Sequence, residues 1–212
     1  MKTVTMSNSV TLNGREFPIN ADASKQQGCY VEILATIDRN LMAMLSYHSR
    51  VLVIQFVVHL HDPEPLNTGI SKLMDVFKKR LKRKYKLTRI GGGWARETGK
   101  SGIPHYHVAL FLDGNLVRSH YGLQDLVAKI LDDRNYPQPR FTESHMVART
   151  DFESLKKAFY HLSYIAKTRH KGSRPPSTND YSFGRLKVNT LRDAKTRELQ
   201  EKERRDFGQH ID

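Results

Sequence analysis

The stretch "RVLVIQFVVHL" at residues 50–60 constrains the fold more than any other part of the chain. Its apolar residues follow one another without alternation and are rich in β-branched side chains, which predicts a strand buried at the centre of a sheet. The same stretch is far too short to cross a bilayer, so we expect no membrane association.

Apolar residues at helical spacing predict one helix before this strand, over 28–47, and another after it, over 70–84. Further along, the pattern predicts strands at 85–97, 105–113, 141–149 and 181–187, and helices at 122–134 and 151–171. This order predicts an α+β fold, an antiparallel sheet of ferredoxin-like (split βαβ) topology flanked by helices. We expect residues 1–26 to form a loosely held polar arm, 27–190 a single domain, and 191–212 a charged helical tail.

The chain carries 35 Lys and Arg against 22 Asp and Glu, a net charge of +13. Such an excess favours a polyanionic partner, most often nucleic acid. Basic clusters mark the candidate contacts: Lys78, Lys79, Arg80, Lys82, Arg83, Lys84, Arg169, Lys171 and Arg174. Cys29 is the only cysteine and the N-terminus has no apolar leader, so we expect a cytoplasmic protein without an internal disulfide.

Two histidines, His105 and His107, lie two residues apart and therefore share one face of their predicted strand. Neutral imidazoles bind divalent transition metals, and Glu97 could add a carboxylate across the hairpin. A second pair, His59 and His61, has the same spacing, so the spacing alone does not identify a site.

The segments "PHYHVALFL" and "YIAK" together resemble the HUH endonuclease superfamily. Adding "HSRVLVIQFVVHL", "WARETGKSGIPHYHVALFLDG" and "SFG", the chain is similar to the filamentous-phage (inovirus) type of rolling-circle replication initiator, including prophage-encoded relatives. The resemblance covers roughly residues 47–184.

This resemblance implies that His105 and His107 hold Mg²⁺ or Mn²⁺. It implies Glu97, Gln55 or His59 as the third ligand, with Glu97 preferred. Tyr164 would be the nucleophile and Lys167 would lie near it or the scissile phosphate, whereas Tyr160 would be a bystander or helper. The partners would be single-stranded or extruded DNA at a replication origin of a phage, prophage or plasmid-like element, and host replication proteins, in the bacterial cytoplasm.

Three other functions are compatible with parts of the pattern. A non-catalytic module that recognises an origin or operator would explain the charge but would leave the histidine pair and Tyr164 without a role. A hydrolase using metal-activated water would not need Tyr164 and would form no covalent adduct. An RNA-binding domain of the RRM type is disfavoured because its aromatic signature is missing from the predicted central strands.

Overall fold

The computed structural model describes residues 3–60, 66–99, 103–169, 171 and 178–190 of the protein. Its centre is a five-stranded antiparallel sheet in the order β8-β5-β7-β6-β9. The strands are β5 (Arg50–His59), β6 (Gly91–Thr98), β7 (Pro104–Asp113), β8 (Arg140–Ala148) and β9 (Tyr181–Phe183). The predicted central strand is confirmed, because β5 lies inside the sheet with β7 and β8 on its two sides.

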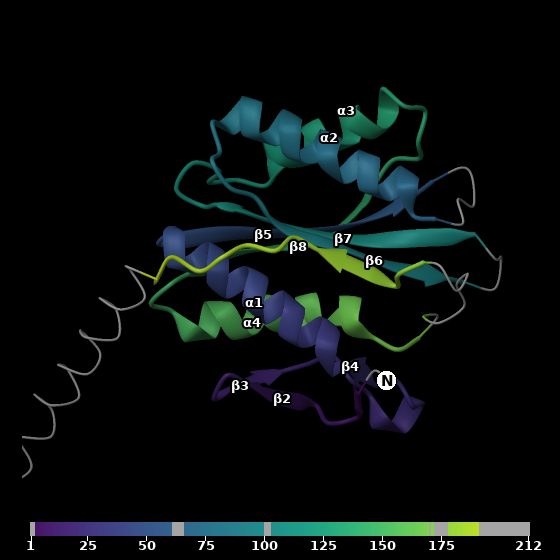
Figure 1. Ribbon diagram of the computed structural model, residues 1–212, viewed down its shortest axis with the longest axis vertical. Coiled ribbons are helices and arrows are strands. Elements are labelled where there is room, and N and C mark those ends of the chain that lie inside the picture. Colours follow the sequence, from purple (N-terminus) through teal and green to yellow (C-terminus); the bar gives the residue numbers. More distant parts are fainter. Residues whose placement is uncertain (1–2, 61–65, 100–102, 170, 172–177, 191–212) are drawn as a thin grey trace, which may run out of the picture.

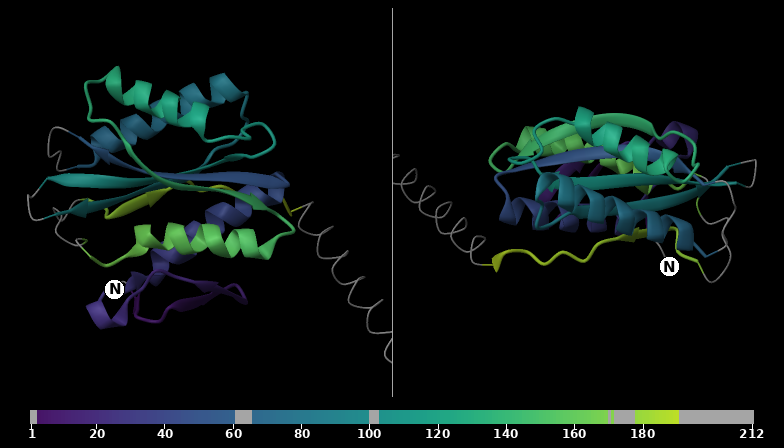
Figure 2. Two further views of the ribbon diagram at one scale, coloured as in Figure 1. Left: turned by 180° about the vertical axis from the view of Figure 1, so that it is seen from behind. Right: turned by 90° about the horizontal axis from the view of Figure 1, so that it is seen from above.

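Two helices cover each face of the sheet, and the N-terminal strands lie beyond one of these helix pairs (Figures 1 and 2). Helices α2 (Thr68–Tyr85) and α3 (Tyr121–Asp132) lie on one face, and α1 (Val31–Tyr47) and α4 (Phe152–Leu162) on the other. Of the four strands β5 to β8, the last in the chain (β8) lies at one side, followed across the sheet by the first (β5), the third (β7) and the second (β6). This is the strand order of the split βαβ fold. The predicted α+β fold is therefore confirmed. No helix in the described part of the chain is long and apolar enough to cross a membrane.

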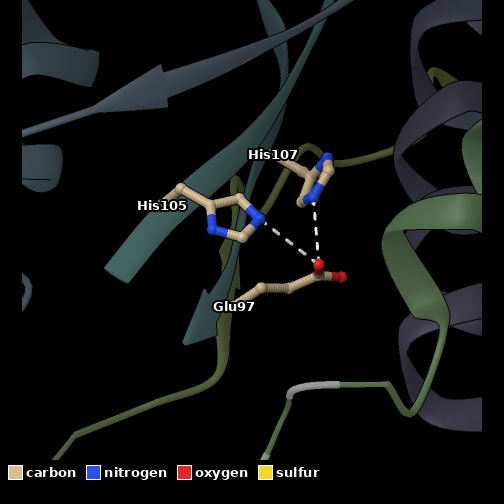
Figure 3. A group of neighbouring side chains, drawn as sticks. All are labelled: Glu97, His105 and His107. Carbon is tan, nitrogen blue, oxygen red and sulfur yellow. Dashed lines mark ion pairs between the residues drawn. The ribbon is translucent and has the colours of Figure 1, made fainter. Parts of the chain in front are cut away.

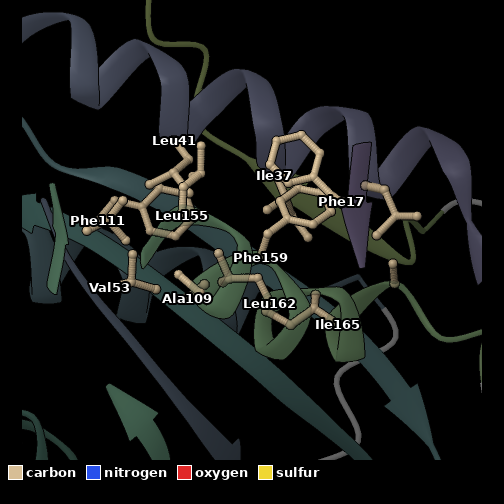
Figure 4. Packing of buried hydrophobic residues seen from close by; sticks show 14 of the residues in the cluster. Phe17, Ile37, Leu41, Val53, Ala109, Phe111, Leu155, Phe159, Leu162 and Ile165 are labelled. Atoms are coloured by element: carbon tan, nitrogen blue, oxygen red, sulfur yellow. The ribbon is translucent and has the colours of Figure 1, made fainter. Parts of the chain in front are cut away.

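Alternation along the strands gives each face its own core. Val53, Ala109 and Phe111 point toward α1 and α4, where they pack with residues such as Leu41 and Phe159 (Figure 4). The opposite side chains, among them Phe56, Trp94, Tyr106 and Val108, pack against α2 and α3. Any residue of β6 or β7 can thus be assigned to a face from its position alone.

The predicted loose arm at residues 1–26 is wrong for the residues that the structure describes there. Strands β2 (Ser9–Leu12) and β3 (Arg15–Pro18) form a hairpin through Asn13 and Gly14, whose positive φ angles suit a tight two-residue turn. Phe17 is fully buried and stacks on Phe159 of α4, with ring centroids 4.3 Å apart. The remaining N-terminal elements are β1 (Val4–Thr5), a 3₁₀ helix (Ala23–Lys25) and β4 (Cys29–Tyr30). The predicted tail at 191–212 lies outside the described residues.

The helix predicted over 151–171 is shorter than expected. It begins at Phe152 with Asp151 as its cap, and it gives way at Ser163 to a 3₁₀ helix (Ser163–Ala166). The Ser163 hydroxyl donates to the carbonyl of Tyr160 and accepts from the amide of Asn20. The amide of Thr168 then donates to the carbonyl of Gly28. The N-terminal segment is therefore hydrogen-bonded to the end of this helix and to the chain that follows it.

Candidate metal centre and adjacent tyrosine

The pairing of β6 with β7 brings the predicted metal ligands together. Glu97 is directly opposite His105, and His107 follows two residues later on the same face. One carboxylate oxygen of Glu97, Oε2, lies 3.4 Å from Nε2 of His105 and 3.2 Å from Nε2 of His107 (Figure 3). Neighbouring ligands about 2.1 Å from a single ion stand ~3 Å apart, so this spacing is close to that of a coordination shell.

The other carboxylate oxygen of Glu97 is held by a buried lysine. Nζ of Lys171 lies 2.6 Å from Oε1, and the Lys171 side chain is 0% exposed. Burial alone would raise the pKa of Glu97, but the adjacent imidazoles of His105 and His107 and the Lys171 ammonium outweigh it and lower that pKa. Glu97 is therefore an oriented, ionised carboxylate whose Oε2 faces the two histidines.

The residues fit a divalent cation by a second criterion. Nε2 of His107 is buried and has no hydrogen-bond partner among the described residues, although it lies near Glu97. A buried polar atom without a partner is costly, and a cation at this position would satisfy it. Two imidazoles and one carboxylate also form a donor set that divalent transition metals accept.

The other two candidates for the third ligand are used differently. The Gln55 amide donates to the carbonyl of His161, 3.3 Å away. The His59 ring stacks on His105 with centroids 5.5 Å apart, and its nitrogens are not grouped with the three ligand atoms. The geometry thus favours Glu97. His61, of the second histidine pair, lies outside the described residues.

Tyr164 lies beside this cluster. Its ring centroid is 5.4 Å from that of His107, and the residue is 41% exposed. The Nζ atom of Lys167 lies 5.0 Å from the centre of the same ring. Tyr160 is oriented differently from Tyr164, because its ring contacts His161 and not the cluster of Glu97, His105 and His107.

A pocket of about 400 Å³ opens next to Tyr164. His107 and Tyr164 contribute to its wall, as do the exposed Arg140 and Glu143 from β8 and His161 from α4. Glu143, His145 and His161 form another group whose possible ligand atoms lie within 4.8 Å of one another. Sequence reasoning missed Arg140 and this group, because residue 161 is far from strand β8 in the sequence. The sequence signal for this group was the two-residue spacing of Glu143 and His145, which allows both side chains to share one face of the strand.

Among the residues that the structure describes, none of the predicted basic contacts lines the pocket. Lys79, Lys82, Arg83 and Lys84 are exposed on α2, with Lys78 and Arg80 partly exposed, but α2 covers the opposite face of the sheet. Arg169 is exposed. The prediction that Lys171 contacts nucleic acid is contradicted by its burial against Glu97. Arg174 lies outside the described residues.

Comparison with known proteins adds one finding. Neither the curated proteins nor the solved structures include a match to the chain. Residues 13–132 match the family described as the YagK/YfjJ C-terminal domain. The match covers more than half of the chain, from the β2–β3 turn through α3, and includes Glu97, His105 and His107. The chain therefore belongs to the YagK/YfjJ C-terminal domain family.

Proposed function

We propose that the protein is a metal-dependent DNA strand-nicking and strand-transfer enzyme of the HUH type, with Tyr164 as its nucleophile. It would initiate rolling-circle replication of a phage, prophage or plasmid-like element in the bacterial cytoplasm. The observation that carries this proposal is the position of Tyr164, partly exposed and 5.4 Å ring to ring from His107, beside the cluster of Glu97, His105 and His107.

The residues around Tyr164 suit a phosphoryl transfer. A phenol has an ordinary pKa of about 10, so its proton must leave during attack on phosphorus. Nζ of Lys167, 5.0 Å from the centre of the Tyr164 ring, is close enough to contact a phosphate bound beside that residue. A divalent cation such as Mg²⁺ or Mn²⁺, held by Glu97, His105 and His107, would supply positive charge to a non-bridging phosphate oxygen.

In this transfer the phenolate oxygen of Tyr164 bonds to phosphorus as the bond from phosphorus to the 3′ oxygen breaks. The departing 3′ oxygen takes up a proton, leaving a 5′-phosphotyrosine and a free 3′-hydroxyl. Because a phosphodiester is exchanged for another phosphodiester, a later 3′-hydroxyl can reverse the step and rejoin the strand. Nicking and rejoining therefore need no nucleoside triphosphate.

The pocket supports a single-stranded substrate. Its walls bring Tyr164 and His107 to one cavity with the exposed guanidinium of Arg140, which can contact a backbone phosphate. A duplex keeps its bases paired and stacked inside a wide cylinder, whereas a nucleotide of a single or extruded strand can enter a pocket of about 400 Å³.

The test is a cleavage assay on labelled single-stranded oligonucleotides tiled across the DNA that flanks the gene, with Mg²⁺ or Mn²⁺. We expect the wild type and Tyr160→Phe to cleave and to form a protein–DNA adduct, and Tyr164→Phe to bind DNA without cleaving it. His105→Ala should lose metal-dependent cleavage. Specific binding by the wild type without cleavage under either metal would instead support a non-catalytic DNA-binding module, and cleavage by Tyr164→Phe would support a water nucleophile.

A further inference from the structure

We propose that Glu143, His145 and His161 form a second site for a divalent transition metal, separate from the cluster of Glu97, His105 and His107. The ligand atoms would be Oε2 of Glu143, Nε2 of His145 and Nδ1 of His161. This inference rests on the geometry of these three residues and does not depend on the proposed nicking function.

The three atoms already converge. Nδ1 of His161 lies 3.1 Å from Oε2 of Glu143 and 2.6 Å from Nε2 of His145. The contact from His145 to the same Glu143 oxygen is 3.9 Å. Two imidazole nitrogens that are 2.6 Å apart must share a proton, and a metal ion takes the place of such a proton. Opening this contact by ~0.5 Å gives the spacing of neighbouring ligands around one ion.

The local structure explains why these side chains meet. Glu143 and His145 alternate along β8, so they can share a face of the strand. The pairing of β8 with β5 shifts register between Ile54 and Phe56, and such irregularities redirect neighbouring side chains. His161 comes from the last turn of α4, the helix that contacts β8.

The position of His161 is braced by its neighbours. Its carbonyl accepts a hydrogen bond from the Gln55 amide, and the Gln55 backbone carbonyl accepts one from the Thr142 hydroxyl, 3.2 Å away. These bonds hold the backbone from which the His161 side chain projects. The brace links β5, β8 and α4, the three elements around the cluster.

The cluster borders open space. Glu143 and His161 line the same pocket of about 400 Å³ as His107 and Tyr164. Three protein ligands beside a pocket leave a coordination position for water or for an oxygen of a bound molecule. A donor set with two imidazoles and one carboxylate suits Zn²⁺, Co²⁺ or Mn²⁺ better than Ca²⁺.

The two clusters are separate sites and not a bridged pair. His107 lies on β7 and Glu143 on β8, and β5 runs between these strands. Two interstrand spacings amount to ~9.6 Å, whereas ions in a shared two-metal centre lie about 3.5–4 Å apart.

Equilibrium dialysis of the full-length, tag-free protein against buffered Zn²⁺, with bound metal counted by mass spectrometry, tests the proposal. We expect two ions per wild-type chain. One ion should remain in the double variant His105→Ala/His107→Ala and one in Glu143→Gln/His161→Asn, and none when the four changes are combined. The control is His120→Asn, a histidine outside both clusters that bonds to Ser144, and it should keep both ions.

Far-ultraviolet circular dichroism of each variant checks its fold. The single change Glu143→Gln, at a side chain that is 73% exposed, provides a mild test that spares the buried histidines and should weaken one site only. The proposal is overturned if the wild type binds a single ion that His105→Ala/His107→Ala removes, or if Glu143→Gln/His161→Asn binds as much Zn²⁺ as the wild type. In either case His145 and His161 are only a hydrogen-bonded pair.

Discussion

The Lys171 ammonium is a fully buried charge whose closest carboxylate is that of Glu97. Burial lowers the pKa of Lys171, and the neighbouring Glu97 carboxylate acts against that shift. The two oxygens of the Glu97 carboxylate have different partners, because Oε1 faces Lys171 while Oε2 faces His105 and His107. Lys171 is thus a positioning residue for the candidate metal centre.

We predict that Glu97→Gln, which leaves the buried ammonium without its carboxylate, lowers the free energy of unfolding of the metal-free protein by about 3–5 kcal/mol. Adding Lys171→Met should recover part of this loss, because the double variant has no unpaired buried charge. Urea unfolding of the wild type, both single variants and the double variant measures the coupling.

A matched control is the surface pair of Lys156 and Glu153, 2.8 Å apart, with Glu153 71% exposed. Glu153→Gln should change the free energy of unfolding by no more than ~0.5 kcal/mol, as is usual for exposed pairs. Equal losses in Glu97→Gln and Glu153→Gln would contradict the importance given to the buried pair.

At the scale of elements, the main strands and helices could be predicted because their side-chain patterns are long and regular. The apolar runs of β5 and β7 each define a strand without tertiary information. The pairing of Glu97 with His105 followed from a short hairpin between adjacent strands.

Elements that depend on distant partners could not be predicted. The N-terminal hairpin has four-residue strands, too short for a periodic signal, and its apolar anchor Phe17 packs on Phe159. The early end of α4 has no Gly or Pro near Ser163 to mark it, and the segment there is hydrogen-bonded to Asn20 and Gly28, which are distant in the sequence. The cluster at Glu143 requires knowing that α4 packs beside β8.

The hairpin gives a prediction about stability. Phe17→Ala removes a fully buried ring from the core between β3 and α4, and we expect it to lower the free energy of unfolding by about 3–5 kcal/mol. Glu16→Ala, at the exposed neighbouring position of β3, should change it by less than ~0.5 kcal/mol. Denaturant unfolding followed by circular dichroism distinguishes the two, and near-equal effects would mean that the N-terminal segment is only loosely held.

At the scale of the whole molecule, the sheet separates the pocket beside Tyr164 from the exposed basic side chains of α2. The candidate metal centre and the pocket face α1 and α4, whereas the exposed lysines of α2 lie beyond the other face. A short single strand bound in the pocket therefore has no direct path to α2. Only a longer DNA that passes around the edge of the sheet could reach both.

This separation predicts different effects from basic residues on the two sides. Arg140→Gln, in the pocket wall, should weaken binding of a short oligonucleotide and reduce its salt dependence by about 0.7 in the slope of log K against log salt. Arg83→Gln, on exposed α2, should leave both quantities unchanged for the same oligonucleotide. Fluorescence anisotropy across a salt series measures them, and a larger effect from Arg83→Gln would place the strand on the α2 face.

The most direct test of the central proposal is to locate the covalent bond between protein and DNA. The protein would be incubated with Mn²⁺ and a cleavable single-stranded oligonucleotide, digested with protease and nuclease, and analysed by tandem mass spectrometry. The proposed function predicts a nucleotide linked through its 5′-phosphate to Tyr164, and no such linkage to Tyr160. Cleaved DNA with no modified peptide, or with the nucleotide on another residue, would contradict the role given to Tyr164.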